Sequence, residues 1–342
     1  MSKICRLATL LFLLTGCSPA NDDAIPLVIY VNGHSMSKLP FVIAQELGLY
    51  RKYGLDVEFQ MPPPEFDAAI IPRAPLLLRV QRRLGLIQRP LPAIVVTGHT
   101  PTIYNQVNLL DARQQVALAA TDCSVRYYIV AQPGIESLEE IRGKRIGINR
   151  MGTTSAFAAM RLIERMGWDR QFDVSVLERT RGIEDLELDR AEVIVGGDEI
   201  YEQARRHGYS ILADTRSWND ALAGNSVLVD VGWLDQGNNR DAARRFLQAV
   251  IEGLAVFHQE PERAVDIAYR WYGFPDREFA RARLDRADYV TRTPFPCYTG
   301  IENTMQVHDS HAMRQHQAAD FFDDSLIREL SDSGFIDSVY RR

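Results

Sequence analysis

Residues 39–57, LPFVIAQELGLYRKYGLDV, indicate the fold of this chain because they join a helical pattern to a strand pattern. Between residues 39 and 49 the apolar side chains recur at intervals of three and four, which predicts a helix that closes at Gly48. Residues 55–59 alternate apolar and polar side chains, which is typical of a strand. The apolar run 25–31 predicts a buried strand before the helix. Together these segments form a strand–helix–strand unit, which is typical of an α/β sheet.

The alternation of strands and helices continues along most of the chain. Further strands are predicted at residues 93–96, 127–130, 145–148, 174–177, 193–195 and 210–212. Helices are predicted between them at residues 76–84, 153–166, 183–188 and 198–207. After Asn225 the pattern becomes helical, with helices predicted at residues 240–258, 262–272, 276–289 and 301–319. We therefore expect an α/β protein with parallel sheets, whose C-terminal helices pack back on the first sheet.

Length and charge limit the class of protein. The chain has 342 residues, enough for about two domains, and a formal net charge of −6. Nucleic-acid binding over a broad surface needs a basic face, so this charge argues against it. Four cysteines are too few for a disulfide scaffold. No G-x-x-x-x-G-K phosphate loop and no G-x-S-x-G nucleophile elbow occurs in the sequence, so neither type of site is predicted.

The N-terminus has the pattern of an export signal. A short basic segment is followed by the apolar run 7–14, which is too short to span a membrane. Leu14-Thr15-Gly16-Cys17 then resembles a bacterial lipobox, in which the cysteine is diacylated and becomes the first mature residue. This predicts a signal peptide at residues 1–16, lipidation at Cys17 and a tether at residues 17–24, with membrane anchoring through the lipid. The alternative is a plain secretory signal with a chance cysteine.

Two cysteines, Cys123 and Cys297, remain when the leader is removed and Cys17 is acylated. An exported compartment permits a disulfide between them. The alternative is two separate buried thiols, because free cysteine often serves as a small core residue. The sequence leaves both interpretations open.

Three segments together resemble a known protein family. They are residues 39–57, residues 135–147 (IESLEEIRGKRIG) and residues 321–337 (FFDDSLIRELSDSGFID). The chain resembles ABC transporter substrate-binding lipoproteins of the sulfonate/nitrate/taurine and thiamine-precursor (NMT1/THI5-like) binding-protein family. The resemblance covers nearly the whole mature chain. It departs from the family pattern at residues 66–70 and 190–194, which in relatives line or support the ligand cleft, so ligand identity is not carried over.

The resemblance implies a type II periplasmic binding protein fold, in which two α/β lobes enclose a ligand cleft and are joined by two hinge crossings. Lobe 1 would comprise residues 25–125 and 216–342, and lobe 2 residues 126–215, with crossings near residues 124–127 and 213–225. The implied protein is a monomeric, periplasmic or cell-surface lipoprotein without enzymatic activity or cofactor. It would bind a small anionic or heteroaromatic ligand and deliver it to ABC permease and ATPase subunits. The alternatives are a ligand-sensing or scaffold lipoprotein and an enzyme on the same fold, similar to a pyrimidine-precursor synthase.

Ligands of open α/β sheets bind beyond the carboxyl ends of strands, and this rule selects the candidate residues. They follow the strands at residues 25–31, 145–148 and 193–195, and are Asn32, His34, Ser35, Arg150, Gly152, Thr153, Thr154, Ser155, Gly197 and Asp198. Hydroxyl groups and free backbone N–H groups at the helix start after Gly152 favour an anionic group, and Arg150 is suited to pair with a sulfonate or carboxylate. The alternative for Thr153, Thr154 and Asp198 is that each only caps its own helix.

Histidines and arginines near the C-terminus have simpler interpretations. His308, His311 and His316 complete no H-E-x-x-H pattern, so a solvated helix face is favoured over a metal site. Arginines alternate with aspartate over residues 281–286, which also predicts a solvated helix face. Phe41, Tyr104 and Trp218 are candidates for stacking on a flat ligand, although aromatic side chains more often belong to the core.

Overall fold

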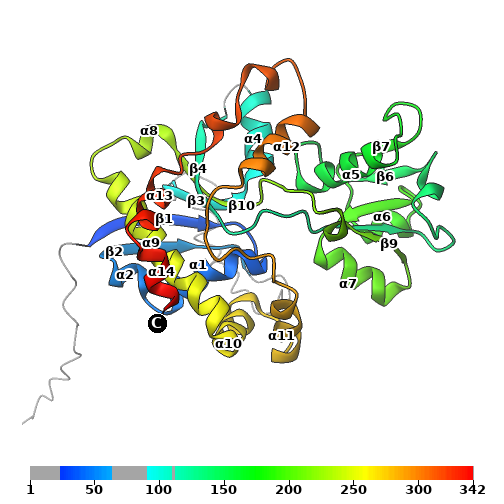
Figure 1. Cartoon of the computed structure of the whole chain (residues 1–342). Helices are drawn as coiled ribbons and strands as arrows, with labels where there is room; N and C mark the ends of the chain where they lie inside the picture. The colour runs from blue at the N-terminus through cyan, green and yellow to red at the C-terminus, as the bar shows by residue number, and fades with distance from the viewer. Residues whose placement is uncertain (1–23, 64–90, 110–111, 342) are drawn as a thin grey trace, which may run out of the picture.

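The computed structural model describes residues 24–63, 91–109 and 112–341, which form two sheets surrounded by helices (Figure 1). This arrangement confirms the α/β class. Within the described residues, no helix is long and apolar enough to cross a membrane. The predicted signal peptide, Cys17 and the helix expected at residues 76–84 lie outside the described residues.

The first sheet has five strands in the order β2-β1-β3-β10-β4. Their bounds are Ile25–Val31 for β1, Leu55–Gln60 for β2, Ile94–Gly98 for β3, Gln115–Ala120 for β4 and Asn225–Asp230 for β10. β1 pairs in parallel with β2 and β3, whereas β10 is antiparallel to both β3 and β4. The expectation of wholly parallel sheets is therefore wrong. The chain enters β10 on its return from the second sheet, and it runs against its neighbours there.

Helices from both ends of the chain cover the first sheet. They are α1 (Leu39–Glu46), α2 (Leu49–Lys52), α8 (Val231–Leu234), α9 (Asn239–Gln259), α10 (Pro261–Tyr272), α13 (Ser325–Asp332) and α14 (Phe335–Tyr340). The predicted helix over residues 39–49 is interrupted at Gly48, whose positive φ of 66° starts a separate turn, α2. Tyr50 of α2 stacks on Phe246 of α9 with ring centroids 5.3 Å apart. The expected return of the C-terminal helices to the first sheet is thus confirmed (Figure 1).

The second sheet has the strand order β7-β6-β8-β5-β9. The strands are β5 (Tyr128–Ala131), β6 (Arg145–Gly147), β7 (Ser175–Leu177), β8 (Val193–Gly196) and β9 (Ser210–Asp214). Their helices are α5 (Thr154–Arg165), α6 (Ile183–Glu187) and α7 (Asp198–His207), all close to the predicted ranges. β6 is parallel to β7 and β8, but β5 is antiparallel to β8 and β9. This sheet and its helices, green in Figure 1, lie beside the first sheet.

Two segments of chain run between the sheets. One leads from β4 to β5, and the other returns from β9 through the 3-10 turn Thr215–Trp218 to β10. They run antiparallel where they pass, with a bridge between Ser124 and Ala221. A backbone hydrogen bond from Val125 N to Asp220 O, 3.3 Å long, reinforces this contact. The joint between the sheets is therefore a short two-stranded ribbon.

The remaining elements differ most from expectation. α4 (His99–Asn108), β4 and β10 are not predicted. α11 (Arg277–Asp285) is shorter than predicted, and the helix predicted at 301–319 is confirmed only as far as Val307. There α12 (Tyr298–Val307) is followed by the short 3-10 turns Met313–Gln315 and Ala318–Phe321; two further turns lie at Met36–Lys38 and Glu139–Ile141.

His308 corrects the interpretation of the C-terminal histidines. It directly follows α12 and is 6% exposed, with its ring 5.2 Å from that of Tyr104 in an edge-to-face contact. Burial lowers its pKa to about 4, so the ring is neutral at pH 7. A solvated helix face is therefore wrong for His308, because the chain turns inward after Val307. In the part of the chain that the structure describes, no three metal-binding side chains gather.

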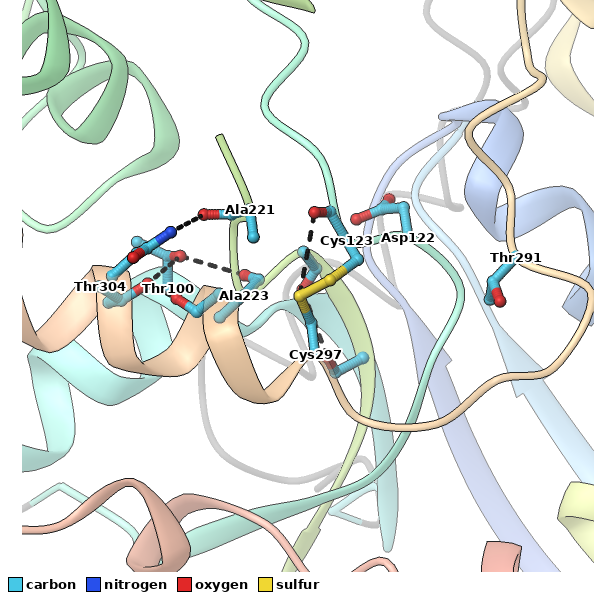
Figure 2. The surroundings of a disulfide bond; sticks show 12 residues. Thr100, Asp122, Cys123, Ala221, Ala223, Thr291, Cys297 and Thr304 are labelled. Carbon is cyan, nitrogen blue, oxygen red and sulfur yellow. Dashed lines mark hydrogen bonds between the residues drawn. A yellow bond between two sulfur atoms is a disulfide. The ribbon is translucent and has the colours of Figure 1, made fainter. Parts of the chain in front are cut away.

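Cys123 and Cys297 form a disulfide, which settles the question that the sequence left open (Figure 2). The two Cα atoms are 5.4 Å apart and the residues are 174 positions apart in the sequence. Cys123 lies in the first segment between the sheets, and Cys297 directly precedes α12. The disulfide therefore attaches that segment to a helix near the first sheet, beside Asp122 and Ala223 in Figure 2.

Candidate functional site

A cleft of about 530 Å³ lies between the two sheets. It is bounded by residues that follow β1, β3, β6 and β8, by the segments between the sheets, and by α11. Its lining includes Asn32, Gly33, His34, Ser35, Ser37, Lys38, Thr97, Gly98, Pro101, Asp122, Ser124, Arg126, Tyr127, Asn149, Thr153, Thr154, Gly197, Asp198, Glu199, Ile200, Leu222, Gly224, Asn225, Arg283 and Tyr289. The cleft thus lies at the carboxyl ends of strands from both sheets, where α/β folds place ligands.

Most of the residues predicted from strand ends reach this cleft. Those that line it are Asn32, His34, Ser35, Thr153, Thr154, Gly197 and Asp198. The other three predicted residues, Arg150, Gly152 and Ser155, do not line it. Arg150 is exposed, and the Ser155 hydroxyl turns inward to accept a 3.0 Å hydrogen bond from Asn149 N.

A network of hydrogen bonds forms the first-sheet wall of the cleft. Asn225 donates through its side-chain amide to Ser37 Oγ and to Asp122 Oδ2, each at 2.8 Å. The backbone N–H of Asn225 donates to Asp122 Oδ1 at 2.9 Å. Lys38 donates to the carbonyl oxygen of Asn32. These bonds hold polar side chains from β10 and from the loop after β1 in fixed positions before any ligand arrives.

His34 and the two cleft tyrosines are also held by their surroundings. His34 is 8% exposed, and its ring makes an edge contact with Tyr272 at 5.2 Å. Burial raises the pKa of Tyr127, which hydrogen-bonds Thr154, and burial raises the pKa of Tyr289 to about 12. Both phenols are therefore neutral at pH 7.

Arg126 also lines the cleft and is held in place by two contacts. Its guanidinium carbon lies 3.6 Å from the centroid of the Tyr289 ring, and its Nη2 donates to the carbonyl oxygen of Arg286 at 2.9 Å. Its Nε is buried and has no hydrogen-bond partner among the described residues. The stacking and the carbonyl fix the plane of the guanidinium, so its orientation is set before any ligand arrives.

Arg283 and Ser124 add two further donors of the same kind. Arg283 is 13% exposed and pairs through Nη2 with Asp198 Oδ2 at 3.0 Å, but its Nε is buried with no partner in the described part of the chain. The Ser124 hydroxyl is likewise buried and unpartnered there. A buried donor without an acceptor costs about 1–3 kcal/mol. All three residues line the cleft, and we call them the donor cluster (Ser124, Arg126 and Arg283).

The sequence did not reveal the donor cluster. Arg283 falls in the stretch 281–286, for which a solvated helix face was expected, and that expectation is wrong at this residue. Its side chain pairs with Asp198 of α7. Helical spacing shows which residues share one face of α11, but it does not specify which other helix packs against that face. For Arg126 and Ser124 a signal was present, because both lie near the predicted crossing at residues 124–127.

Gly152 lies where the helices of the two sheets meet, and it leads to a prediction. Its φ is +80°, and an added Cβ would overlap the ring of Tyr104 on α4. We expect Gly152→Ala to lower the free energy of unfolding by about 2–4 kcal/mol, from overpacking together with backbone strain. It should also weaken ligand binding, because moving the α5 end away from α4 relieves the clash.

Gly143→Ala is the matched control for this prediction. Gly143 has a φ of +83° and open space where a Cβ would lie, so its variant carries only the backbone strain of about 1 kcal/mol. Thermal unfolding and ligand titration of both variants distinguish the two effects. Equal losses of stability would show that the contact with Tyr104 does not matter.

Comparison with known proteins identifies the fold. No protein-family model matches the chain, and no curated protein matches it in sequence. Among solved structures, it is similar to the periplasmic aliphatic sulphonate binding protein SsuA from Escherichia coli, with a TM-score of 0.59 and 16% identity over 83% of this chain and 85% of the other. It is also similar to the periplasmic nitrate-binding protein NrtA from Synechocystis PCC 6803, with a TM-score of 0.60 and 14% identity over 91% and 89%.

A third similar structure is a mutant of DszB in complex with biphenyl-2-sulfinic acid, with a TM-score of 0.59 and 14% identity over 90% of this chain and 99% of the other. At such identities the likeness concerns the fold and carries no ligand with it. Two mixed sheets surrounded by helices, with a cleft at the strand ends, therefore place this chain in the periplasmic binding protein fold.

Proposed function

We propose that this protein is the extracytoplasmic solute-binding component of an ABC-type importer and takes up a small anionic ligand in the cleft. The donor cluster carries the proposal, since all three of its residues line the cleft and each has a donor without a partner among the described residues. Similar structures include binding proteins for sulphonate and nitrate, and the fold is the one such proteins use. Of the two ligand chemistries that the sequence left open, these donors favour the anionic one over the heteroaromatic one.

We assign residues 25–125 and 216–342 to lobe 1 and residues 126–215 to lobe 2, with hinges near 124–127 and 213–225. Ligand binding would close the lobes by rotation about the two-stranded ribbon, and the closed form would dock on the permease and ATPase complex. Closure needs ligand contacts with both lobes. The cleft meets this requirement, because its lining includes Arg283 of lobe 1 as well as Thr153, Thr154 and Asp198 of lobe 2.

Two ion pairs join α11 to α7 and would stabilise the closed form. Arg283 pairs with Asp198 at 3.0 Å, and Arg286 pairs with Glu202 at 3.2 Å with side chains 30% and 23% exposed. We expect Arg286→Glu to weaken ligand binding roughly tenfold, because like charges then face each other across the lobes. The double variant Arg286→Glu with Glu202→Arg should restore most of the affinity. Titration calorimetry measures both, and a double variant as weak as the single one would contradict the role of this pair.

We further propose that the protein acts as a monomer and is held at the membrane by acyl chains on Cys17. The lipobox motif at residues 14–17 supports this placement. Intact-mass measurement of the full chain expressed in a bacterial host should give a diacylated species that begins at Cys17. A Cys17→Ala variant should instead stay unprocessed and unacylated. An unmodified protein cleaved at another position would exclude the anchor.

Small-angle scattering tests the binding role directly. The soluble chain from Ser18 would be measured alone and with sulfonates, carboxylates, phosphates and nitrate, after a thermal-shift screen of the same anions. A ligand present at about 100 times its dissociation constant adds about 2.7 kcal/mol of stability. We expect one class of anion to raise the unfolding temperature and to change the radius of gyration. An anion that binds without any change in scattering would argue against hinge closure.

No enzymatic role is proposed. The cysteine next to the cleft, Cys123, is in a disulfide and so offers no thiolate nucleophile. Transport and sensing are separated by genetics, because loss of an importer component abolishes uptake of the ligand, whereas loss of a sensor leaves uptake intact.

A further inference from the structure

We propose that the cleft is built for a polyhydroxylated organic anion, meaning a sugar-like or polyol body that carries one carboxylate, sulfonate or phosphate group. This inference rests on the proposed function and specifies the ligand class of the same site. It follows from the chemistry of the lining as a whole, from the contacts that already engage Tyr127 and Tyr289 among the described lining residues, and from the size of the cleft.

The anionic group belongs at the donor cluster, and the rest of the lining disfavours a second one. Three carboxylates, those of Asp122, Asp198 and Glu199, also line the cleft. Asp198 is neutralised by Arg283, whereas Asp122 is 5% exposed and bonded to Asn225, a neutral residue. A negative charge placed beside Asp122 would be repelled at short range in a poorly solvated site. The ligand is therefore expected to carry its negative charge at one end only.

Asp122 is suited to receive hydroxyl groups from the ligand. Each of its two oxygens accepts one hydrogen bond from Asn225, and a carboxylate has about four acceptor positions in all. An ionised carboxylate accepts and cannot donate, so its remaining positions select a ligand O–H or N–H group. The cleft lining also includes hydroxyl side chains, which both donate and accept, and these are Ser35, Ser37, Thr97, Thr153 and Thr154. Donors and acceptors of this kind match a ligand with several hydroxyl groups.

Both tyrosine rings of the described lining, Tyr127 and Tyr289, are already in contact with other groups of the protein. The Arg126 guanidinium covers Tyr289 at 3.6 Å. Tyr127 packs against the core of the second sheet and hydrogen-bonds Thr154. Two of the proposed stacking residues lie elsewhere, since Phe41 is buried against Phe246 and Tyr104 faces His308. An aryl sulfonate or a heteroaromatic ring would thus be placed against polar groups, leaving them without hydrogen bonds.

Cleft size argues against a small inorganic ion. A volume of about 530 Å³ lies in the range of about 300–1,000 Å³ that organic ligands occupy. One water takes about 30 Å³ of liquid, so nitrate or sulfate at the donor cluster would leave most of the cleft filled with water. A hydroxylated body of six or so carbon atoms would replace that water and keep its hydrogen bonds.

Matched ligands test this inference on the soluble chain from Ser18. Gluconate is compared with hexanoate, which lacks the hydroxyl groups, and with glucitol, which lacks the charge. Glucose 6-phosphate and 6-deoxy-6-sulfoglucose distinguish the three anionic groups, with hexanesulfonate, benzenesulfonate and nitrate as competitors. We expect at least one hydroxylated anion to bind tenfold or more tightly than its unhydroxylated or uncharged counterpart in calorimetry. Arg126→Met should weaken that binding by about 100-fold, which places it in the cleft.

The outcomes separate the ligand class from the proposed function. If hexanesulfonate, benzenesulfonate or nitrate binds as tightly as any hydroxylated anion, the inference is overturned while the binding role stands. If no hydroxylated anion with any of the three groups binds, the inference is also overturned. The binding role is then tested separately. Freshly purified protein is denatured and the released small molecules are identified by mass spectrometry, because a binding protein retains an anion from the cell.

Discussion

Replacing Arg126 with methionine is expected to weaken binding of the anionic ligand by about 100-fold, which corresponds to about 2.7 kcal/mol. The loss is large because the guanidinium is held in place before binding, by Tyr289 at 3.6 Å and by the carbonyl oxygen of Arg286 at 2.9 Å. Its Nε has no acceptor among the described residues, so a ligand anion that contacts the guanidinium would gain a charge-assisted hydrogen bond. Methionine keeps an unbranched apolar stem that ends near the position of the arginine Nε, but it removes the guanidinium with its charge and donors.

Arg165→Met is the matched control, because Arg165 has a similar setting outside the cleft. Its guanidinium lies 5.2 Å from the Trp218 ring centroid, and its Nη2 donates to the carbonyl oxygen of Trp218 at 2.9 Å. It also pairs with Asp220 at 3.2 Å, so the control tests the loss of a stacked, paired arginine. We expect a modest loss of stability and unchanged affinity in this variant. Calorimetric titration measures the affinity of both variants. Equal affinities for wild type and Arg126→Met would show that Arg126 does not contact the ligand.

Arg126→Lys refines the test. Lysine keeps the positive charge but replaces the planar guanidinium with a flexible point charge that cannot stack on Tyr289 in the same way. We expect its affinity to lie between those of wild type and Arg126→Met. If Arg126→Lys binds as tightly as wild type, the site needs only a charge, and the fixed orientation of the donor has no role.

Removing the disulfide is expected to lower the free energy of unfolding by about 2–5 kcal/mol and the unfolding temperature by roughly 5–10 °C. The reason is the length of the closed loop, since the bonded cysteines are 174 residues apart. In the unfolded chain such a bond removes much conformational freedom, and its loss restores that freedom. Calorimetry of the double variant Cys123→Ser, Cys297→Ser against the oxidised protein measures the effect.

Affinity should also fall several-fold in this variant. Cys123 lies between Asp122 and Ser124, both of which line the cleft, so the disulfide fixes the backbone of two cleft residues against α12 (Figure 2). A reductant should lower the affinity of the wild type in the same way, and as the control it should change nothing in the double variant. Two free thiols in the denatured, unreduced soluble chain would contradict the bond itself.

Local sequence patterns determined the elements near the start of the chain. The unit β1, α1 and β2 follows from side-chain spacing, because a helix or strand that is buried on one face has apolar residues at regular intervals in its sequence. The same holds for the strand ends that bring Asn32, Thr153 and Asp198 to the cleft, since a strand and the loop after it are contiguous in the chain. The α/β class was predictable for this reason.

Tertiary structure decided what depends on partners far apart in the sequence. β10 joins the first sheet against the direction of β3 and β4, and nothing within Asn225–Asp230 specifies that pairing. Arg126 and Arg283 are far apart in the sequence, yet both line the cleft, and Arg126 donates to the carbonyl oxygen of Arg286 directly after α11. Cys123 and Cys297 meet for a similar reason. The local spacing of apolar residues indicates whether a side chain is buried. Which distant group that side chain contacts depends on how the helices and strands pack. The donor cluster depends on this packing, so the sequence alone did not predict it.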